Sequence, residues 1–118
     1  MPGMIHHAAA LLKACSDPTR FRILNLLRRG ELCVCDLMDV LALPQSKVSR
    51  HLAYLKRVAL VQGRKEGLWM HYCLSSEGLR FTAKVIEACS GSRAGIPEFD
   101  HDLKTLRQKK KKLVGCFK

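Results

Sequence analysis

Two cysteines separated by one residue, Cys33 and Cys35, are the residues of this sequence best suited to metal chemistry. Side chains two positions apart point to different faces of a regular α-helix, so a C-x-C pair there cannot hold one ion without distortion. On an extended chain the same two side chains share a face. We therefore expect Cys33 to end a short extended segment and Cys35 to lie near the N-cap of the helix that follows. A helix N-terminus lowers the pKa of a thiol, and the thiolate is the form that binds soft ions.

The other interpretation of this pair is structural. Free cysteine behaves as a small apolar residue and is often buried, so Cys33 and Cys35 can equally be two core residues. Cysteine is a poorer helix N-cap than serine or aspartate, which favours another use at that position. The spacing alone leaves both interpretations open.

A second group of residues is cationic and suits a polyanionic partner. The chain has 21 Lys and Arg against 10 Asp and Glu, a formal charge of +11, and no acidic residue lies between Pro44 and Lys65. Glutamine can form two hydrogen bonds with adenine, and lysine can reach the acceptors of guanine. An ordinary solvated amphipathic helix is the alternative, and for His51 a packing role is as open as a phosphate contact. The candidate contacts to nucleic acid are Gln45, Ser46, Lys47, Ser49, Arg50, His51, Arg64 and Lys65.

The elements that position these residues are predicted to be mostly helical, with one small β-hairpin. Apolar residues at helical spacing predict helices over 5–15, between Pro18 and Gly30, around 37–41, and over 45–58 and 77–89. Residues 60–62 and 68–74 are predicted to be the strands of a hairpin, with Arg64 and Lys65 in its charged tip at 63–67. Two short helices, a tight turn and a following hairpin are the order of a winged helix-turn-helix.

The chain is short enough for one domain and carries an appended basic segment. We expect residues 1–90 to form the winged helix-turn-helix domain, for DNA binding and dimerisation, and residues 91–118 to be a linker and basic tail with a short helix from Pro97. Residues 104–118 hold seven cations and no acid, leaving 14 basic residues against 10 acidic ones elsewhere. The tail is expected either to make salt-sensitive, sequence-independent contacts with DNA phosphate or to be a solvated end.

Three segments carry a family resemblance: S-D-P-T-R-F-R-I-L at 16–24, E-L-C-V-C-D-L at 31–37 and Q-S-K-V-S-R-H-L at 45–52. Together they resemble the ArsR/SmtB family over roughly residues 8–89, and the second segment resembles its arsenic- and cadmium-sensing branch. The resemblance implies a homodimer built on the first and fifth helices, which represses transcription and releases DNA when a metal or metalloid binds. Such a two-fold dimer would read an inverted repeat in double-stranded DNA, with half-sites roughly 34 Å apart.

The inducer implied by the resemblance is As(III) or Sb(III), with Cd(II) or another soft thiophilic ion also open. Trivalent arsenic prefers three sulfurs, and the arsenic branch often has its third cysteine where this sequence has Met38. Cys116, in the lysine-rich tail, is the leading candidate for the third thiolate. Cys89, Cys15 or a site with only two sulfurs remain the alternatives.

The same residues leave two other functions open. A thiol-redox or persulfide-sensing repressor would use the same fold, and a non-specific architectural DNA-binding protein would use the same charge. We find no catalytic motif and expect no enzyme. The sequence shows no secretory signal and no run of about 20 apolar residues, so we expect a cytoplasmic protein without a membrane partner, whose six cysteines are not a disulfide framework.

Overall fold

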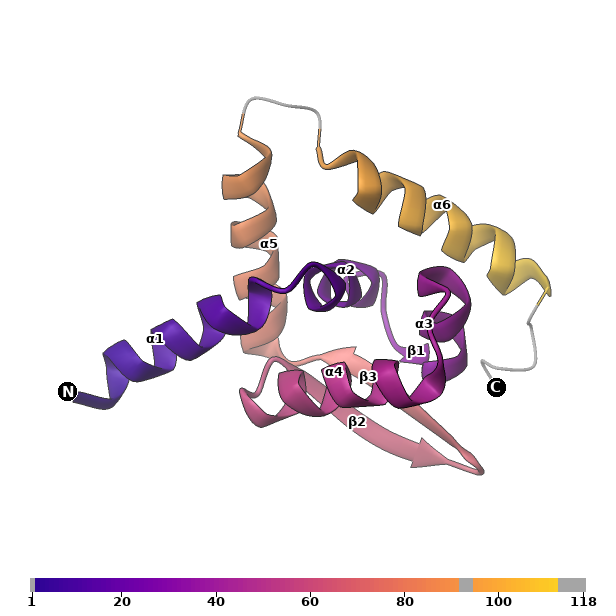
Figure 1. Ribbon diagram of the computed structural model, residues 1–118, viewed down its shortest axis with the longest axis horizontal. Helices are drawn as coiled ribbons and strands as arrows, with labels where there is room; N and C mark the ends of the chain where they lie inside the picture. The colour runs from indigo at the N-terminus through magenta and orange to yellow at the C-terminus, as the bar shows by residue number, and fades with distance from the viewer. Residues whose placement is uncertain (1, 92–94, 113–118) are drawn as a thin grey trace.

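The computed structural model describes residues 2–91 and 95–112, which form six helices and a three-stranded sheet (Figure 1). The elements in chain order are α1 (Pro2–Cys15), α2 (Pro18–Leu27), β1 (Leu32–Cys33), α3 (Val34–Leu41), α4 (Gln45–Arg57), β2 (Val61–Glu66), β3 (Trp69–Leu74), α5 (Ser76–Ser90) and α6 (Pro97–Lys112). The predicted winged helix-turn-helix is confirmed: α3 and α4 are its helix pair, and the β2–β3 hairpin is its wing.

Local sequence explains where these helices begin and end. The Asp17 carboxylate accepts the Arg20 N–H at 3.0 Å, and Pro18 takes the first position of α2, where its missing N–H costs nothing. Ser75 caps α5 in the same way, accepting the Gly78 N–H at 2.9 Å. At the end of α3 the chain reverses through Ala42, which has a left-handed φ of 54°. The short turn that follows leads directly into α4.

The wing differs from the prediction at its tip. β2 and β3 pair antiparallel from Val61–Leu74 to Glu66–Trp69, so 63–66 lie in β2 and the turn consists of Gly67 and Leu68. Gly67 has a φ of +63°, which suits a two-residue hairpin turn. The expected charged tip at 63–67 is therefore wrong, because residues 63–66 pair with 69–72 as part of the strand, and Arg64 and Glu66 form an ion pair within β2.

A two-residue strand joins the wing to the segment that contains the cysteine pair. β1 lies on the free edge of β3, giving the strand order β1-β3-β2 with Leu32 opposite Tyr72 and Cys33 opposite His71. The sequence indicated an extended segment here but not its pairing. The start of α3 is thus hydrogen-bonded to the sheet of the wing.

The core lies between α2, α3 and α4 and is closed on one side by α6. α6 lies above α2 and α3 in Figure 1, contacts both helices and buries Phe99 and Leu106. The Phe99 ring packs edge-on against Phe21 at 4.9 Å, and Asp102 accepts two hydrogen bonds from Arg22 at 2.8 and 2.9 Å. The large aliphatic side chains with no exposed surface are Ile23, Leu24, Leu26, Leu32, Leu37, Val48, Leu52, Leu55 and Leu60. No helix in the described ranges is long and apolar enough to cross a membrane.

Candidate functional site

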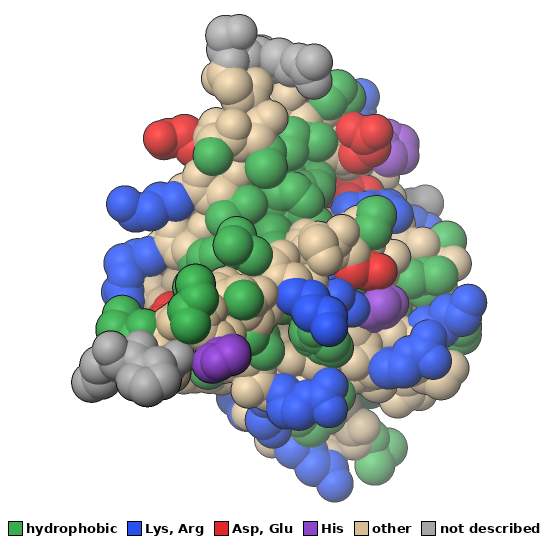
Figure 2. Space-filling view, turned by 60° about the vertical axis from the view of Figure 1, so that its left-hand side comes forward, with side chains coloured by type: hydrophobic (Ala, Val, Ile, Leu, Met, Phe, Trp, Pro, Cys, Tyr) green, Lys and Arg blue, Asp and Glu red, His purple; other side chains and the backbone are tan. Residues whose placement is uncertain are grey.

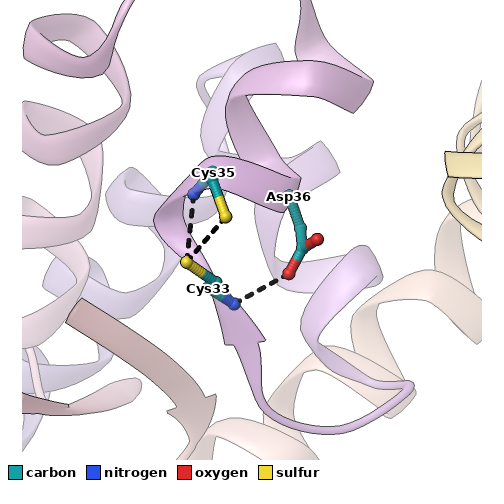
Figure 3. Close-up of side chains that lie close together, drawn as sticks. All are labelled: Cys33, Cys35 and Asp36. Atoms are coloured by element: carbon teal, nitrogen blue, oxygen red, sulfur yellow. Dashed lines mark hydrogen bonds between the residues drawn. The ribbon is translucent and has the colours of Figure 1, made fainter. Parts of the chain in front are cut away.

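The two cysteines lie side by side where β1 becomes α3 (Figure 3). Cys33 ends β1 in an extended conformation, as predicted, and is itself the N-cap of α3, while Cys35 lies in the first turn. Their sulfur atoms are 2.8 Å apart, and the Cys35 N–H donates to Cys33 Sγ at 3.4 Å. The backbone change from strand to helix therefore gathers both sulfurs, as one ion would require.

Asp36 completes this cluster and was not recognised from the sequence as a candidate ligand. Its buried carboxylate accepts the Cys33 N–H at 3.0 Å, and one ligand atom from each of Cys33, Cys35 and Asp36 lies within 4.8 Å of the others. Aspartate three residues after an N-cap is the capping-box arrangement, with Cys33 in the place of serine or threonine. The three-residue spacing between Cys33 and Asp36 is the sequence signal from which this contact could have been predicted.

The electrostatics of the Cys33 thiol differ from the expectation. Burial raises the pKa of Cys33, the nearby Asp36 charge raises it further, and the Cys35 and Asp36 backbone contacts only partly oppose this. The lowered pKa predicted from the helix N-terminus is therefore wrong for Cys33. The thiolate at this position needs a bound cation to be favoured near neutral pH.

The other cysteines proposed as a third ligand, Cys15, Cys89 and Cys116, are not part of the cluster that the structure describes. Cys15 is buried and Cys89 exposed, and both line a groove of about 330 Å³ between α1 and α5. Burial raises the pKa of Cys15 to about 11, with the neighbouring Cys89 adding to the shift. Among the described residues neither cysteine belongs to the Cys33–Cys35–Asp36 cluster. Cys116 lies outside the described residues.

The outer face of α4 carries most of the predicted nucleic-acid contacts. Val48, Leu52 and Leu55 turn into the core, which leaves Gln45, Ser46, Lys47 and Arg50 exposed and Ser49 half-buried. The N-cap is Pro44, which has no side-chain cap bond, so the first N–H groups of α4 remain available to an anion. Lys and Arg side chains gather at the lower right of Figure 2, at the height of α4 and the wing in Figure 1.

His51 is less exposed than the other predicted contacts. Its Nδ1 lies 3.9 Å from the Asp17 carboxylate, and the side chain is 17% exposed. Burial lowers the pKa of His51, with Arg20, Arg50 and Lys47 adding to the effect against the raising influence of Asp17. The imidazole is therefore neutral at pH 7 and can act there as a neutral hydrogen-bond donor.

Arg64 is bound to carboxylates within the chain. It donates to both oxygens of Glu31 at 2.6 and 2.8 Å, and to Glu66 Oε1 at 2.5 Å. The guanidinium lowers the pKa of Glu31. Lys65, the next residue, is exposed. Of the two predicted wing contacts, Lys65 faces solvent, whereas Arg64 ties β2 to the residues just before Cys33.

Comparison with known proteins links these features to one family. Residues 17–62 match the family model described as bacterial regulatory protein, arsR family. The chain is 41% identical to an HTH-type transcriptional regulator of Methanocaldococcus jannaschii over 81 residues, 68% of this chain and 91% of the relative. It is 47% identical over 78 residues to the arsenical resistance operon repressor of Escherichia coli, 65% of this chain and 67% of the relative.

Solved structures give the same result for the fold. HlyU from Vibrio cholerae has a TM-score of 0.70 at 36% identity, covering 77% of this chain and all of that one. The homodimeric winged helix-turn-helix DNA-binding domain of Mb0332 from Mycobacterium bovis has a TM-score of 0.71 at 27% identity, covering 75% of this chain and 83% of that one.

Proposed function

This chain belongs to the ArsR family of bacterial transcriptional regulators, and from that premise we propose that it is a metalloid-responsive repressor. In this proposal a homodimer binds an operator in double-stranded DNA and releases it when As(III) or Sb(III) binds cysteine thiolates. The observation that carries the proposal is the Cys33–Cys35 pair at the start of α3, because α3 packs directly against α4.

The DNA-binding half of the proposal uses the exposed face of α4. Gln45 and Lys47, at its N-terminal end, are assigned to base edges in the major groove. Phosphate contacts are assigned to Ser46, Ser49, Arg50, His51 and Lys65. Arg64 joins them only if DNA phosphate displaces Glu31 and Glu66, which hold it in the free protein.

Dimerisation is assigned to α1 and α5. Large apolar side chains are exposed on both helices, at Met4, Ile5, Leu12 and Leu79. Figure 2, which brings the α1 side forward, shows hydrophobic side chains in a band down this face. Covering such a patch is favourable, and the two-fold axis would set two α4 helices on successive turns of the duplex.

The inducer half of the proposal depends on the N-cap role of Cys33. A trivalent metalloid supplies a soft centre that takes thiolates. Cys33 and Cys35 would hold the ion together, and drawing Cys33 Sγ toward it would displace the atom that now accepts the Cys35 N–H and so disturb the first turn of α3. Because α3 supports α4 and β1 pairs with β3, a shift here alters both parts of the DNA-binding surface.

Cys116 is proposed as the third thiolate. α6 packs against α3 and ends at Lys112, and the four further residues to Cys116 span at most about 14 Å. Cys15 and Cys89 line the groove between α1 and α5, so they are second choices. Asp36 offers an oxygen in place of a third sulfur, which would suit Cd(II) better than As(III).

The proposed function is tested by measuring operator binding with and without arsenite. An operator is first selected from random duplex DNA, and binding is followed by fluorescence anisotropy under reducing conditions. We expect arsenite to weaken operator binding by about 5- to 150-fold, the usual range of allosteric coupling. Equal affinity for random DNA, with no effect of arsenite, would instead identify a non-specific architectural protein.

Replacing Lys47 with alanine should weaken operator binding by about 5- to 150-fold and relax sequence preference at one base pair. Arg50→Ala should weaken binding to all sequences and reduce the dependence on salt. Arg29→Ala, which removes an exposed cation just after α2, is the matched control. An equal loss in the Arg29 variant would refute the assignment of α4 as the reading helix.

We also propose that residues 1–90 carry operator preference and that the basic tail adds contacts to phosphate. Deleting residues 107–118 leaves the buried Leu106 in place and removes six cations. Because each phosphate contact releases counterions, the deletion should flatten the slope of log affinity against log salt concentration. Loss of operator preference in the truncated protein would contradict this division of roles.

Thiol-redox sensing is the second candidate function, and Cys15 and Cys89 favour it because they line one groove. Oxidation by a peroxide would convert two thiols to a disulfide and release two electrons and two protons to form water. Treatment of the reduced protein with hydrogen peroxide should then lower operator affinity, and Cys15→Ser should prevent this. Release of DNA by arsenite in a strong reductant, with the protein mass showing no loss of two hydrogen atoms, would exclude the redox mechanism.

A further inference from the structure

The end of the wing is apolar. Leu68 is 94% exposed, the largest exposure among the large hydrophobic side chains described, and its neighbour Trp69 is 45% exposed. The left-handed Gly67 and the six-residue ladder between β2 and β3 hold this turn in a defined conformation. Leu68 therefore stands at the tip of a hairpin that is paired up to its turn, and it contributes little to the core.

The charged residues of β2 precede this tip, and two of them are paired with each other. Arg64 and Glu66 bind each other, and Arg64 is turned toward Glu31. Lys65 is the remaining exposed cation of β2. An apolar tip in water is unfavourable by roughly 25 cal/mol per Å² of apolar surface, so covering it in a complex favours binding.

The neighbouring surface identifies the partner by its charge. β2 packs against α4, whose exposed residues include Lys47, Arg50, Lys56 and Arg57. The segment between Pro44 and Lys65 contains no acidic residue. In Figure 1 the hairpin projects beneath α4 and away from the body of the molecule. A polyanion bound along α4 would thus lie within reach of the tip.

We propose that Leu68, supported by Trp69, is a wedge that enters the minor groove beside the α4 contact and partly unstacks one base step. This inference rests on the proposed binding of double-stranded DNA. Leucine and other apolar side chains act in this way in proteins that kink duplexes, and pyrimidine–purine steps open most easily. The wedge would bend the operator and give preference for a flexible step at a position that α4 does not touch.

The test uses the full-length protein and the selected operator, labelled at both ends for energy transfer. Wild-type protein should bend the duplex, and Leu68→Ala should remove most of the bend and weaken operator binding by about 5- to 150-fold. Leu68→Met, which keeps a flexible apolar side chain, should restore the bend. Replacing the flexible base step of the operator with a stiff A-tract should weaken operator binding by the wild-type protein but not by Leu68→Ala.

Trp69 gives an independent signal because it is the single tryptophan of the sequence. Its emission should change on binding the operator and remain unchanged on adding a short duplex that spans only the α4 site. Because Leu68 is exposed, Leu68→Ala and Leu68→Met should fold as the wild type does. Equal midpoints of thermal unfolding for the three proteins would verify this.

Three results would overturn the wedge. Unaltered bending by Leu68→Ala, with wild-type operator affinity, would refute it while leaving the proposed function intact. A change in the sedimentation of DNA-free Leu68→Ala would show instead that the tip contacts a second copy of the chain. Failure of the wild-type protein to bind any duplex would refute both the wedge and the proposed function.

Discussion

Replacing Cys33 and Cys35 together with serine is expected to abolish the response to arsenite and leave operator binding nearly unchanged. The wild-type protein should lose about 5- to 150-fold in operator affinity when arsenite binds, and the double variant should show a ratio near one. Serine is a better N-cap than cysteine, so the hydroxyl that replaces the Cys33 thiol still accepts the N–H of the residue two positions on, and α3 still begins at Val34. Operator affinity with and without arsenite, measured by anisotropy, checks both expectations.

The matched control is Cys73→Ser, which alters a half-buried thiol on β3 outside the cluster. It should respond to arsenite as the wild type does. Cys116→Ser separates a three-sulfur site from a two-sulfur one, because it should weaken the response only if the third thiolate comes from the tail. A normal arsenite response in the Cys33 and Cys35 double variant would refute the site.

Asp102→Asn is expected to lower the free energy of unfolding by about 3 kcal/mol, the lower end of the range for breaking a buried ion pair. Asp102 is 1% exposed and binds Arg22 through both oxygens, so the variant leaves a guanidinium facing a neutral amide. The Arg22 side chain is 33% exposed, and water can relieve part of this cost. Urea unfolding followed by circular dichroism measures the change.

Asp100→Asn is the control for this change, since Asp100 lies on the exposed side of the same helix. It should differ from the wild type by less than about 0.5 kcal/mol. If the Asp102 variant is no less stable than the Asp100 variant, the ion pair does not anchor α6. Since α6 also covers α3, a loosened α6 should change the arsenite response as well.

Local signals were sufficient for much of the fold and for the cysteine pair. Apolar spacing indicated the helices, and Asp17 with Pro18 marked the start of α2 as the structure has it. The extended conformation of Cys33 followed from requiring two side chains, two positions apart, to share a face. These inferences succeeded because each depends on contacts within a few residues of the chain.

What sequence reasoning missed depends on contacts between distant residues. The two-residue β1 has no pattern of its own and exists because the edge of β3 binds it. Arg64 looked like a free cation until Glu31, 33 residues away, was found beside it. The Asp102 partner, Arg22, lies 80 residues away in the chain. For Cys33, the burial that raises its pKa depends on how the chain packs in three dimensions, which the residues next to it do not reveal.

The N-cap position of Cys33 has a consequence for how regulators on this fold diverge. An acceptor at that position stabilises the start of a helix, and here the acceptor is also the proposed sensing atom. Exchanging sulfur for oxygen there would separate an inducible regulator from a constitutive one by a single atom, with the fold unchanged. A lineage could therefore gain or lose its response to the inducer by one codon change without passing through an unstable intermediate. In the design of a biosensor, the same exchange would switch the response to the inducer on or off.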